Sequence, residues 1–213
     1  MTKDLASIRR DYMLKQLTET DIDPDPVNQF KKWLNEAIEA CVNEPTAMAL
    51  ATATRDGYPS VRIVLLKKVI PGGLIFFTNY SSRKGRQITE NPHAALVFYW
   101  AELERQVRIE GDVKKLPEHE SDEYFYSRPL GSRIGAWASP QSEVIPNRAF
   151  LDEMVLKFQK QFQSGTIERP DNWGGFCLEP KVIEFWQGRE SRLHDRIRFT
   201  KADGKWKIER LAP

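Results

Sequence analysis

The sequence predicts an α+β fold in which a mostly antiparallel sheet closes into a split β-barrel with peripheral helices. Short apolar or alternating segments recur along the chain, separated by turn signals such as Arg55-Asp56-Gly57 and Ala202-Asp203-Gly204. These segments follow one another without the regular helical crossovers that parallel strand pairs require. Because closure of a sheet removes its exposed edges, a closed or split barrel is the favoured architecture.

Helical periodicity predicts three or four helices at the periphery. Residues 1–20 indicate either a short, weak helix or an arm that orders on binding. Residues 26–42 form an amphipathic helix, with Asp25 as N-cap and Pro26 at the first helical position. Further helices are predicted at residues 83–90, 117–127 and 146–164.

The remaining periodic segments predict about seven or eight strands. Residues 46–54 are small and compatible with a strand, whereas Arg128 to Ser132 reads as a loop. The clearer strands lie at residues 60–69, 74–78, 94–100, 105–116, 176–178, 182–187, 196–200 and 205–211.

Length and composition describe one ordinary globular domain spanning residues 1–213. A chain of 213 residues buries roughly 70% of its unfolded surface. The formal net charge of +2 is too small for a general nucleic-acid binder. Cys41 and Cys177 lie far apart, which argues against a disulfide framework or a zinc site and favours a reducing compartment. Without an apolar leader or a run of roughly 18 apolar residues, we expect a cytoplasmic protein.

Motif searches exclude two common nucleotide-binding folds. The chain has no Gly-x-Gly-x-x-Gly after a strand and no Gly-x-x-x-x-Gly-Lys-Ser/Thr loop, so a Rossmann unit or a P-loop is not expected. It also lacks the Gly-x-Ser-x-Gly elbow, which leaves a serine-hydrolase triad weakly supported.

Several cations stand at positions that suggest an anionic ligand. Arg62 and Lys67 interrupt an otherwise apolar strand, where each either reaches solvent at a strand end or faces a ligand. Arg83 and Lys84 follow Ser82 at a helix start, where cations oppose the helix dipole unless an anion joins them. A solvated basic turn is the commoner alternative for such a pair.

A second cluster consists of Tyr124, Arg128 and Ser132. This spacing lets a helix end and its following loop supply two hydroxyls and a guanidinium to one anion, and arginine matches phosphate geometry with parallel hydrogen bonds. Each of these residues taken alone is an ordinary surface residue. Gln106 sits between strand residues, where its amide can contact the edge of a heterocycle, and Gln141 and Ser142 follow in a loop too polar to be core.

The segment from Trp186 to Arg196 concentrates charge between two apolar strands. Tryptophan is more often buried in a core than stacked on a ligand ring. His194 has three competing interpretations: a structural histidine, a general base oriented by a carboxylate, or a group that binds a ring. Together with the two phosphate-type clusters, the segment suggests two phosphorylated small molecules held side by side, one of them a cofactor.

With these residues assembled, the chain resembles the pyridoxine (pyridoxamine) 5′-phosphate oxidase family from about Ile8 to Pro213. The most specific match is Ile183-Glu184-Phe185-Trp186-Gln187-Gly188 followed by Arg192-Leu193-His194-Asp195-Arg196. Independent matches are Arg62-Ile63-Val64-Leu65-Leu66-Lys67, Ser82-Arg83-Lys84, Glu104-Arg105-Gln106-Val107 and Ser127-Arg128-Pro129.

The resemblance implies a split β-barrel homodimer with FMN at the subunit interface. It implies oxidation of pyridoxine 5′-phosphate or pyridoxamine 5′-phosphate to pyridoxal 5′-phosphate, with hydride transfer from C4′ to flavin N5. Oxygen then reoxidises the flavin and yields hydrogen peroxide. This places the chain in vitamin B6 (pyridoxal phosphate) biosynthesis and salvage. Alternatives are a non-catalytic FMN or pyridoxal-phosphate binding protein and a flavin barrel that acts on another substrate.

The resemblance also assigns residues to roles, with no metal among them. It assigns flavin contacts to Arg62, Ile63, Val64, Leu65, Leu66, Lys67, Phe77, Thr78, Arg83, Lys84, Gln106, Gln141, Ser142, Trp186 and Arg196. It assigns substrate contacts to Arg9, Arg10, Asp11, Tyr12, Lys67, Tyr124, Arg128, Ser132, Arg192, Leu193 and His194. The expected catalytic residues are Arg192, His194 and Arg196, the Arg9–Tyr12 arm covers the site, and Asp195 is a local structural partner.

Overall fold

The computed structural model describes residue 4 and residues 12–163 and 165–213. The chain divides into two compact units. The first combines residues 1–49, 95–110 and 180–213, and the second combines residues 50–94 and 111–179. The expectation of one domain stays a prediction.

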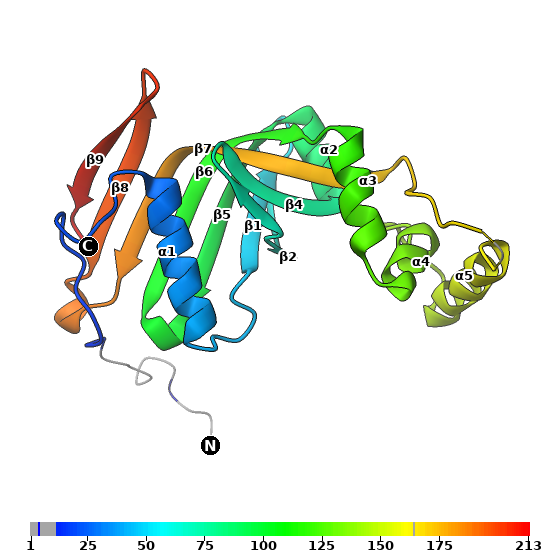
Figure 1. Ribbon diagram of the computed structural model, residues 1–213, viewed down its shortest axis with the longest axis horizontal. Helices are drawn as coiled ribbons and strands as arrows, with labels where there is room; N and C mark the ends of the chain where they lie inside the picture. The colour runs from blue at the N-terminus through cyan, green and yellow to red at the C-terminus, as the bar shows by residue number, and fades with distance from the viewer. Residues whose placement is uncertain (1–3, 5–11, 164) are drawn as a thin grey trace. The chain divides into compact units, whose positions relative to one another are not determined.

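A nine-stranded sheet dominates the described residues, which confirms the mostly antiparallel split-barrel class. Its order is β2-β1-β5-β6-β7-β4-β3, with β8 paired to β7 and β9 paired to β8 (Figure 1). The strands are β1 (Ala47–Ala53), β2 (Pro59–Leu65), β3 (Lys68–Ile70), β4 (Gly73–Asn79), β5 (His93–Trp100), β6 (Arg105–Lys115), β7 (Trp173–Gln187), β8 (Asp195–Ala202) and β9 (Lys205–Leu211).

Two strand predictions were wrong in their boundaries. The single strand expected over 60–69 is two strands, β2 and β3, separated by Leu66 and Lys67, and β3 pairs with β4 from Lys68↔Ile75. Conversely, the two strands expected at 176–178 and 182–187 are one strand, β7. It pairs with β4 through residues 173–178 and with β8 through residues 182–187, so Pro180 lies where these two ladders meet. In the sequence, a proline indicates a break between two strands, but within a strand it is tolerated where a hydrogen-bonded ladder ends.

Five α-helices occur in the described residues, one or two more than expected. They are α1 (Pro26–Glu39), α2 (Arg83–Glu90), α3 (Glu118–Ser127), α4 (Leu130–Ala138) and α5 (Arg148–Gln161). The loop expected at residues 128–132 was wrong in its second half, because α4 begins at Leu130, directly after Pro129. Gly131 lies in the first turn of α4, and because glycine has low helix propensity the sequence favoured a loop there. No helix among the described residues is long and apolar enough to cross a membrane.

Aromatic side chains build the core of the first unit. Phe30 of α1 lies 4.9 Å from Phe98 of β5 between ring centroids, and Trp33 lies 5.2 Å from Phe185 of β7 in an edge-on arrangement. Phe30, Phe98 and Phe185 are at most 1% exposed. Asp25 caps this helix by accepting a hydrogen bond from the Val27 amide, as predicted.

The core of the second unit fixes the junction between α3 and α4. Phe125, Ile134, Ile167 and Trp173 form its buried centre. Because Phe125 and Ile134 flank residues 128–132 in sequence and are both buried, the segment between them is held at both ends. Helix α5 packs against α4 in this unit (Figure 1).

Candidate active site

The second unit contains a cavity of about 810 Å³ whose wall is strongly cationic. Eighteen residues line it, and they come from β2 and the turn after it, β4, α2, α3, α4, the turns before and after α4, and the start of β7. Five of them are basic and none is acidic: Arg62, Lys67, Arg83, Lys84 and Arg128. Five like charges in one cavity repel one another, so the site is built for an anionic ligand.

Arg62 does not project into solvent but is held by the strand beside it. Its Nη1 donates to the Leu50 carbonyl at 2.9 Å and to Thr52 Oγ1 at 2.7 Å, and its Nη2 donates to Ser60 Oγ. Burial and the nearby charge of Arg83 lower the pKa of its guanidinium. Of the two interpretations of Arg62, the structure therefore favours the ligand-facing one.

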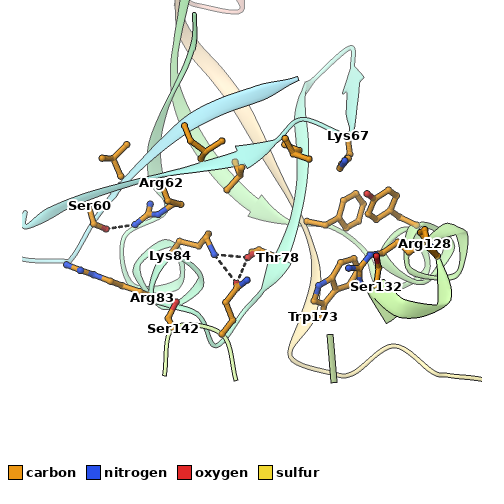
Figure 2. A pocket seen from close by; sticks show the side chains of 18 residues that line it. Ser60, Arg62, Lys67, Thr78, Arg83, Lys84, Arg128, Ser132, Ser142 and Trp173 are labelled. Atoms are coloured by element: carbon orange, nitrogen blue, oxygen red, sulfur yellow. Dashed lines mark hydrogen bonds between the residues drawn. The ribbon is translucent and has the colours of Figure 1, made fainter. Parts of the chain in front are cut away.

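Lys84 lies at the start of α2, in the same region of the cavity. The Ser82 hydroxyl caps this helix by accepting from the Gly85 amide, as predicted. The Lys84 ammonium donates to Thr78 Oγ1 at 3.0 Å and to Gln141 Oε1 at 3.0 Å (Figure 2). Burial and then the charge of Arg62 lower its pKa to about 8. We call Arg62, Arg83 and Lys84 the Arg62 cluster.

A second cationic group in the cavity lies against stacked aromatic rings. Phe77, Tyr124 and Trp173 are stacked, with 3.9 Å between the ring centroids of Phe77 and Tyr124 and 5.6 Å between those of Phe77 and Trp173. The guanidinium carbon of Arg128 lies 4.5 Å from the Trp173 ring centroid. Ser132 of α4 also lines this part of the cavity (Figure 2).

Arg128 has a buried donor without a hydrogen-bond partner. Among the described residues nothing accepts from its Nη1, although that atom is shielded from solvent. Burial lowers the pKa of its guanidinium. A buried, unpaired N–H costs about 1–3 kcal/mol, so the arrangement indicates a bound acceptor. We call Lys67, Tyr124, Arg128 and Ser132 the Arg128 cluster.

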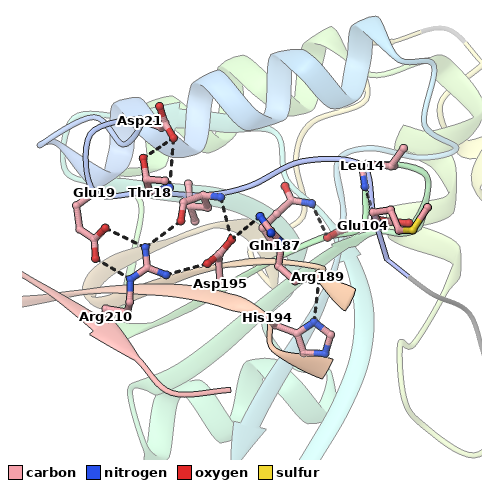
Figure 3. Close-up of polar contacts among 12 residues, drawn as sticks. Leu14, Thr18, Glu19, Asp21, Glu104, Gln187, Arg189, His194, Asp195 and Arg210 are labelled. Atoms are coloured by element: carbon pink, nitrogen blue, oxygen red, sulfur yellow. Dashed lines mark hydrogen bonds and ion pairs between the residues drawn. The ribbon is translucent and has the colours of Figure 1, made fainter. Parts of the chain in front are cut away.

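In the first unit, His194 lies in a cluster of aromatic rings. Its ring centroid is 4.6 Å from that of Trp186 and 5.7 Å from that of Tyr12. His194 Nδ1 accepts a hydrogen bond from the Arg189 amide at 3.1 Å (Figure 3). Burial and the charge of Arg192 lower the pKa of the imidazole. The neutral ring therefore carries its proton on Nε2, which makes that atom a donor.

Asp195 serves the N-terminal segment rather than His194 in the contacts described. Its Oδ2 accepts from the Leu17 amide at 3.1 Å, and its Oδ1 accepts from Arg210 Nη1 at 2.8 Å (Figure 3). The expectation of a local structural partner fits these contacts. They give no support to a base oriented by a carboxylate.

Arg196 of β8 pairs across the sheet with Trp186 of β7. Its guanidinium donates to both carboxylate oxygens of Glu184, at 2.9 and 3.1 Å. This ion pair raises the pKa of the Arg196 guanidinium. Trp186 is only half-buried, so it is not the core residue that tryptophan statistics favour.

The N-terminal arm enters the description at Tyr12, because Arg9, Arg10 and Asp11 lie outside the described residues. The Tyr12 ring lies edge-on to Trp186 at 5.7 Å. Gly188 makes room for it: a Cβ there would lie 2.7 Å from Tyr12 Cγ. Glu104 Oε2 accepts hydrogen bonds from the Met13 and Leu14 amides at 2.9 and 3.1 Å. The described end of the arm is thus bound beside His194.

The predicted site residues divide between the two units. The cavity of the second unit gathers Arg62, Ile63, Val64, Leu65, Lys67, Phe77, Thr78, Arg83, Lys84, Tyr124, Arg128, Ser132, Gln141 and Ser142. Leu66 is buried and is not among its lining residues. The first unit carries Tyr12, Gln106, Trp186, Arg192, Leu193, His194 and Arg196. Leu193 is 69% exposed, and Arg192 has a left-handed backbone with φ of 64°.

Four residues that line the cavity were not predicted: Ser60, Val61, Pro129 and Trp173. Trp173 contributes most directly, because its ring lies under the guanidinium of Arg128. Ser60 lies two residues before Arg62 on β2, on the same strand face, and that alternation was the available signal.

Two family models match the chain. One, described as pyridoxamine 5′-phosphate oxidase, matches residues 34–161. The other, described as pyridoxine 5′-phosphate oxidase C-terminal dimerisation region, matches residues 173–213.

Relatives match along the full length. A pyridoxine/pyridoxamine 5′-phosphate oxidase from Nostoc sp. is 54% identical, with all of both chains covered. One of the same name from Paraburkholderia phymatum is 55% identical over 98% of this chain and 99% of the relative. The crystal structure of PhzG from Burkholderia lata, in complex with tetrahydrophenazine-1-carboxylic acid, has a TM-score of 0.88 and 34% identity, covering 94% of this chain and 99% of that one.

Proposed function

Because the chain belongs to the pyridoxine/pyridoxamine 5′-phosphate oxidase family, we propose that it is an FMN-dependent enzyme that oxidises pyridoxine 5′-phosphate or pyridoxamine 5′-phosphate to pyridoxal 5′-phosphate. The observation that carries the proposal is the 810 Å³ cavity with five basic and no acidic lining residues. Both the cofactor and the substrate are phosphate esters. A single cationic cavity with two separate basic clusters suits that pair.

The Arg62 cluster fits the phosphate of FMN. Arg62 keeps donors free, Lys84 is buried and cationic below pH 8, and Ser142 adds a hydroxyl to the same cavity. Gln141 Oε1 already accepts from Lys84 and so holds the ammonium in place. By the family resemblance, the backbone of β2 and residues Gln106, Trp186 and Arg196 complete the flavin site.

The Arg128 cluster fits the phosphate of the substrate. Arg128 presents an unpaired buried N–H, and its guanidinium carbon lies over the Trp173 ring, 4.5 Å from the centroid. Such a preorganised guanidinium binds phosphate with parallel hydrogen bonds at little entropic cost. Lys67 adds a second charge, and Tyr124 and Ser132 add hydroxyls.

FMN, when bound, supplies the redox chemistry by accepting hydride from C4′ and passing electrons to oxygen, which leaves as hydrogen peroxide. The chain's own residues bind, orient and cover the substrate. We assign the pyridine ring to Arg192 and His194, whose Nε2–H can donate to the 3-hydroxyl oxygen. Arg196 offers a fixed positive charge, oriented by Glu184, to stabilise charge that develops during transfer. The arm ending at Tyr12 limits the access of water.

We further propose that the enzyme is a cytoplasmic homodimer with FMN at the subunit interface. The match of residues 173–213 to a dimerisation region supports the assembly. Strand β2 also presents apolar side chains to solvent beside Arg62: Val61 and Ile63 are 68% and 67% exposed. Apolar side chains in such a row are typical of a surface covered by another chain.

A flavin enzyme acting on a different ring is the second candidate, because PhzG has closely similar structure and binds a phenazine acid. That ligand is a carboxylic acid and carries no phosphate. The Arg128 cluster therefore discriminates between the two candidates. A non-catalytic FMN or pyridoxal-phosphate binding protein is the alternative from another functional class.

The absorbance spectrum of the purified protein tests the proposal. We expect a flavin band that bleaches when pyridoxamine 5′-phosphate is added without oxygen, and returns with peroxide when air is admitted. A protein that neither contains nor takes up FMN refutes the proposal. Flavin binding without bleaching indicates the non-catalytic alternative, and bleaching only by a phenazine acid indicates the second candidate.

A further inference from the structure

A buried glutamine that has no assigned role lies behind Arg62. Gln87 belongs to α2, is 3% exposed, and does not line the cavity. Its Oε1 accepts a hydrogen bond from Thr52 Oγ1 at 2.6 Å and another from Ser60 Oγ at 2.7 Å. These two hydroxyls are the same ones that accept from Arg62.

The direction of every hydrogen bond in this network follows from Arg62. A guanidinium can only donate, so the hydroxyls of Thr52 and Ser60 must accept from it. Each hydroxyl has a single hydrogen, which then points to Gln87 Oε1. The glutamine oxygen has two lone pairs, and both are used. Gln87 thus sets the orientation of both hydroxyls.

The network leaves part of Arg62 available to a ligand. A guanidinium has five N–H donors. The Leu50 carbonyl, Thr52 and Ser60 take three of them, which leaves two for a ligand in the cavity that Arg62 lines. Two parallel donors are what a phosphate group accepts from arginine.

The neutrality of Gln87 matters as much as its oxygen. No carboxylate of the described residues lies within ion-pair distance of Arg62, and its three acceptors are uncharged. A glutamate at position 87 would also accept from the two hydroxyls, but it would offset the charge that attracts an anion. Gln87 keeps an unpaired, buried Nε2 among the described residues. Its amide is therefore tolerated at a cost, consistent with a role for its oxygen.

We propose that Gln87, acting through Thr52 and Ser60, is a positioning residue that holds Arg62 in the orientation that binds the phosphate of the flavin cofactor without neutralising its charge. This inference rests on the proposed function, because it takes FMN as the ligand of the Arg62 cluster. Gln87 itself contacts neither the cofactor nor the substrate. Its effect is to preorganise a donor pair before the ligand arrives.

Comparison of FMN with riboflavin isolates the effect on the phosphate, because riboflavin has the same ring system without it. The apoprotein and its Gln87→Met variant are titrated with each flavin, and binding is followed by quenching of flavin fluorescence. We expect Gln87→Met to weaken FMN binding about tenfold, which corresponds to about 1.4 kcal/mol, while riboflavin affinity changes less than twofold. A merely structural role would change both affinities alike.

A coupling measurement tests the route of the effect. If Gln87 acts through the two hydroxyls, Gln87→Met should change FMN affinity little in a Thr52→Val/Ser60→Ala background. Gln87→Glu should also weaken FMN binding relative to riboflavin, because the added carboxylate competes with the phosphate for Arg62. The single variant Thr52→Val gives the same readout if Gln87→Met does not fold.

Gln29 offers a matched control in the first unit. It is a glutamine of α1 that is 1% exposed and, like Gln87, has a buried Nε2 without a described partner. Gln29→Met should lower the melting temperature without changing the ratio of FMN to riboflavin affinity. If wild-type protein binds FMN but Gln87→Met leaves the ratio of FMN to riboflavin affinity unchanged, the role of Gln87 is refuted and the proposed function is not. Wild-type protein that does not bind FMN overturns the proposed function and this inference together.

Discussion

Replacement of Arg128 by alanine should weaken the binding of a phosphorylated substrate far more than it slows the chemical step. The guanidinium is preorganised by stacking 4.5 Å from the Trp173 ring centroid, and its Nη1 is already shielded from water. A phosphate therefore gains its hydrogen bonds from Arg128 without first displacing solvent from that atom. The KM for pyridoxamine 5′-phosphate should rise while kcat changes little.

The expected size follows from the contacts that are lost. A hydrogen bond to a charged group contributes about 1.5–3 kcal/mol, and a bidentate arginine makes two. Allowing for the charge that Lys67 still provides, we expect a loss of about 2–4 kcal/mol, or roughly 30-fold to 1000-fold in kcat/KM. The kcat/KM of Arg128→Lys should fall between those of the wild type and Arg128→Ala, because lysine keeps the charge but not the planar guanidinium.

Steady-state oxygen uptake with two substrates provides the assay. Pyridoxamine, which lacks the phosphate, serves as the internal control, since Arg128→Ala should change its turnover less than threefold. Thermal melting checks the fold, and we expect only a small shift, because the substitution also removes a buried unpaired donor. Equal losses with pyridoxamine and its phosphate would refute the assignment of Arg128 to the phosphate.

Four further predictions concern other parts of the chain. Arg196→Ala should lower kcat strongly. It should also lower the melting temperature, because it leaves the buried Glu184 carboxylate without its bidentate partner. The double variant with Glu184→Gln should regain the melting temperature in a thermal scan but not kcat in an oxygen-uptake assay. FMN affinity should fall as pH rises through about 8, where Lys84 loses its proton, and fluorescence titrations of Lys84→Met should lose this dependence. Because the folded-state pKa of Lys84 lies below its ordinary value of 10.5, the apoprotein binds fewer protons than the unfolded chain between about pH 8 and 10.5, so its free energy of unfolding should rise with pH in that window in denaturant titrations. Gly188→Ala should displace Tyr12 and speed proteolysis of residues 12–21, whereas an unchanged cleavage rate would show that the arm is held elsewhere.

Most of the fold could be predicted from local patterns. The helix at residues 83–90 and the last strand at residues 205–211 have the predicted bounds, because a serine cap in one case and an Asp-Gly turn in the other mark their ends within a few residues. Prediction failed where the determining partner is distant in sequence. Strand β7 continues through Pro180 because it pairs with β4 on one side of that residue and with β8 on the other.

The candidate site shows the same division. A cation within an apolar strand, one at a helix start and one after a helix end sufficed to nominate Arg62, Lys84 and Arg128 as anion ligands. They did not show that Arg128 rests on Trp173, 45 residues further along the chain, or that Gln87 reaches Arg62 through two hydroxyls. Those relations depend on how the strands and helices pack.

The fold class, the family and most of the cationic site residues could be predicted from the sequence alone. These follow from side-chain chemistry, periodicity and motif order, which are local properties of the chain. Which of these cations have an acidic partner follows from the tertiary structure. Arg196 forms an ion pair with Glu184, whereas Arg62 has only neutral acceptors among the described residues and Arg128 keeps an unpaired N–H there. Pairing and desolvation depend on distances of a few ångströms between different segments of the chain, and these distances decide whether a cation has an acidic partner or only neutral acceptors.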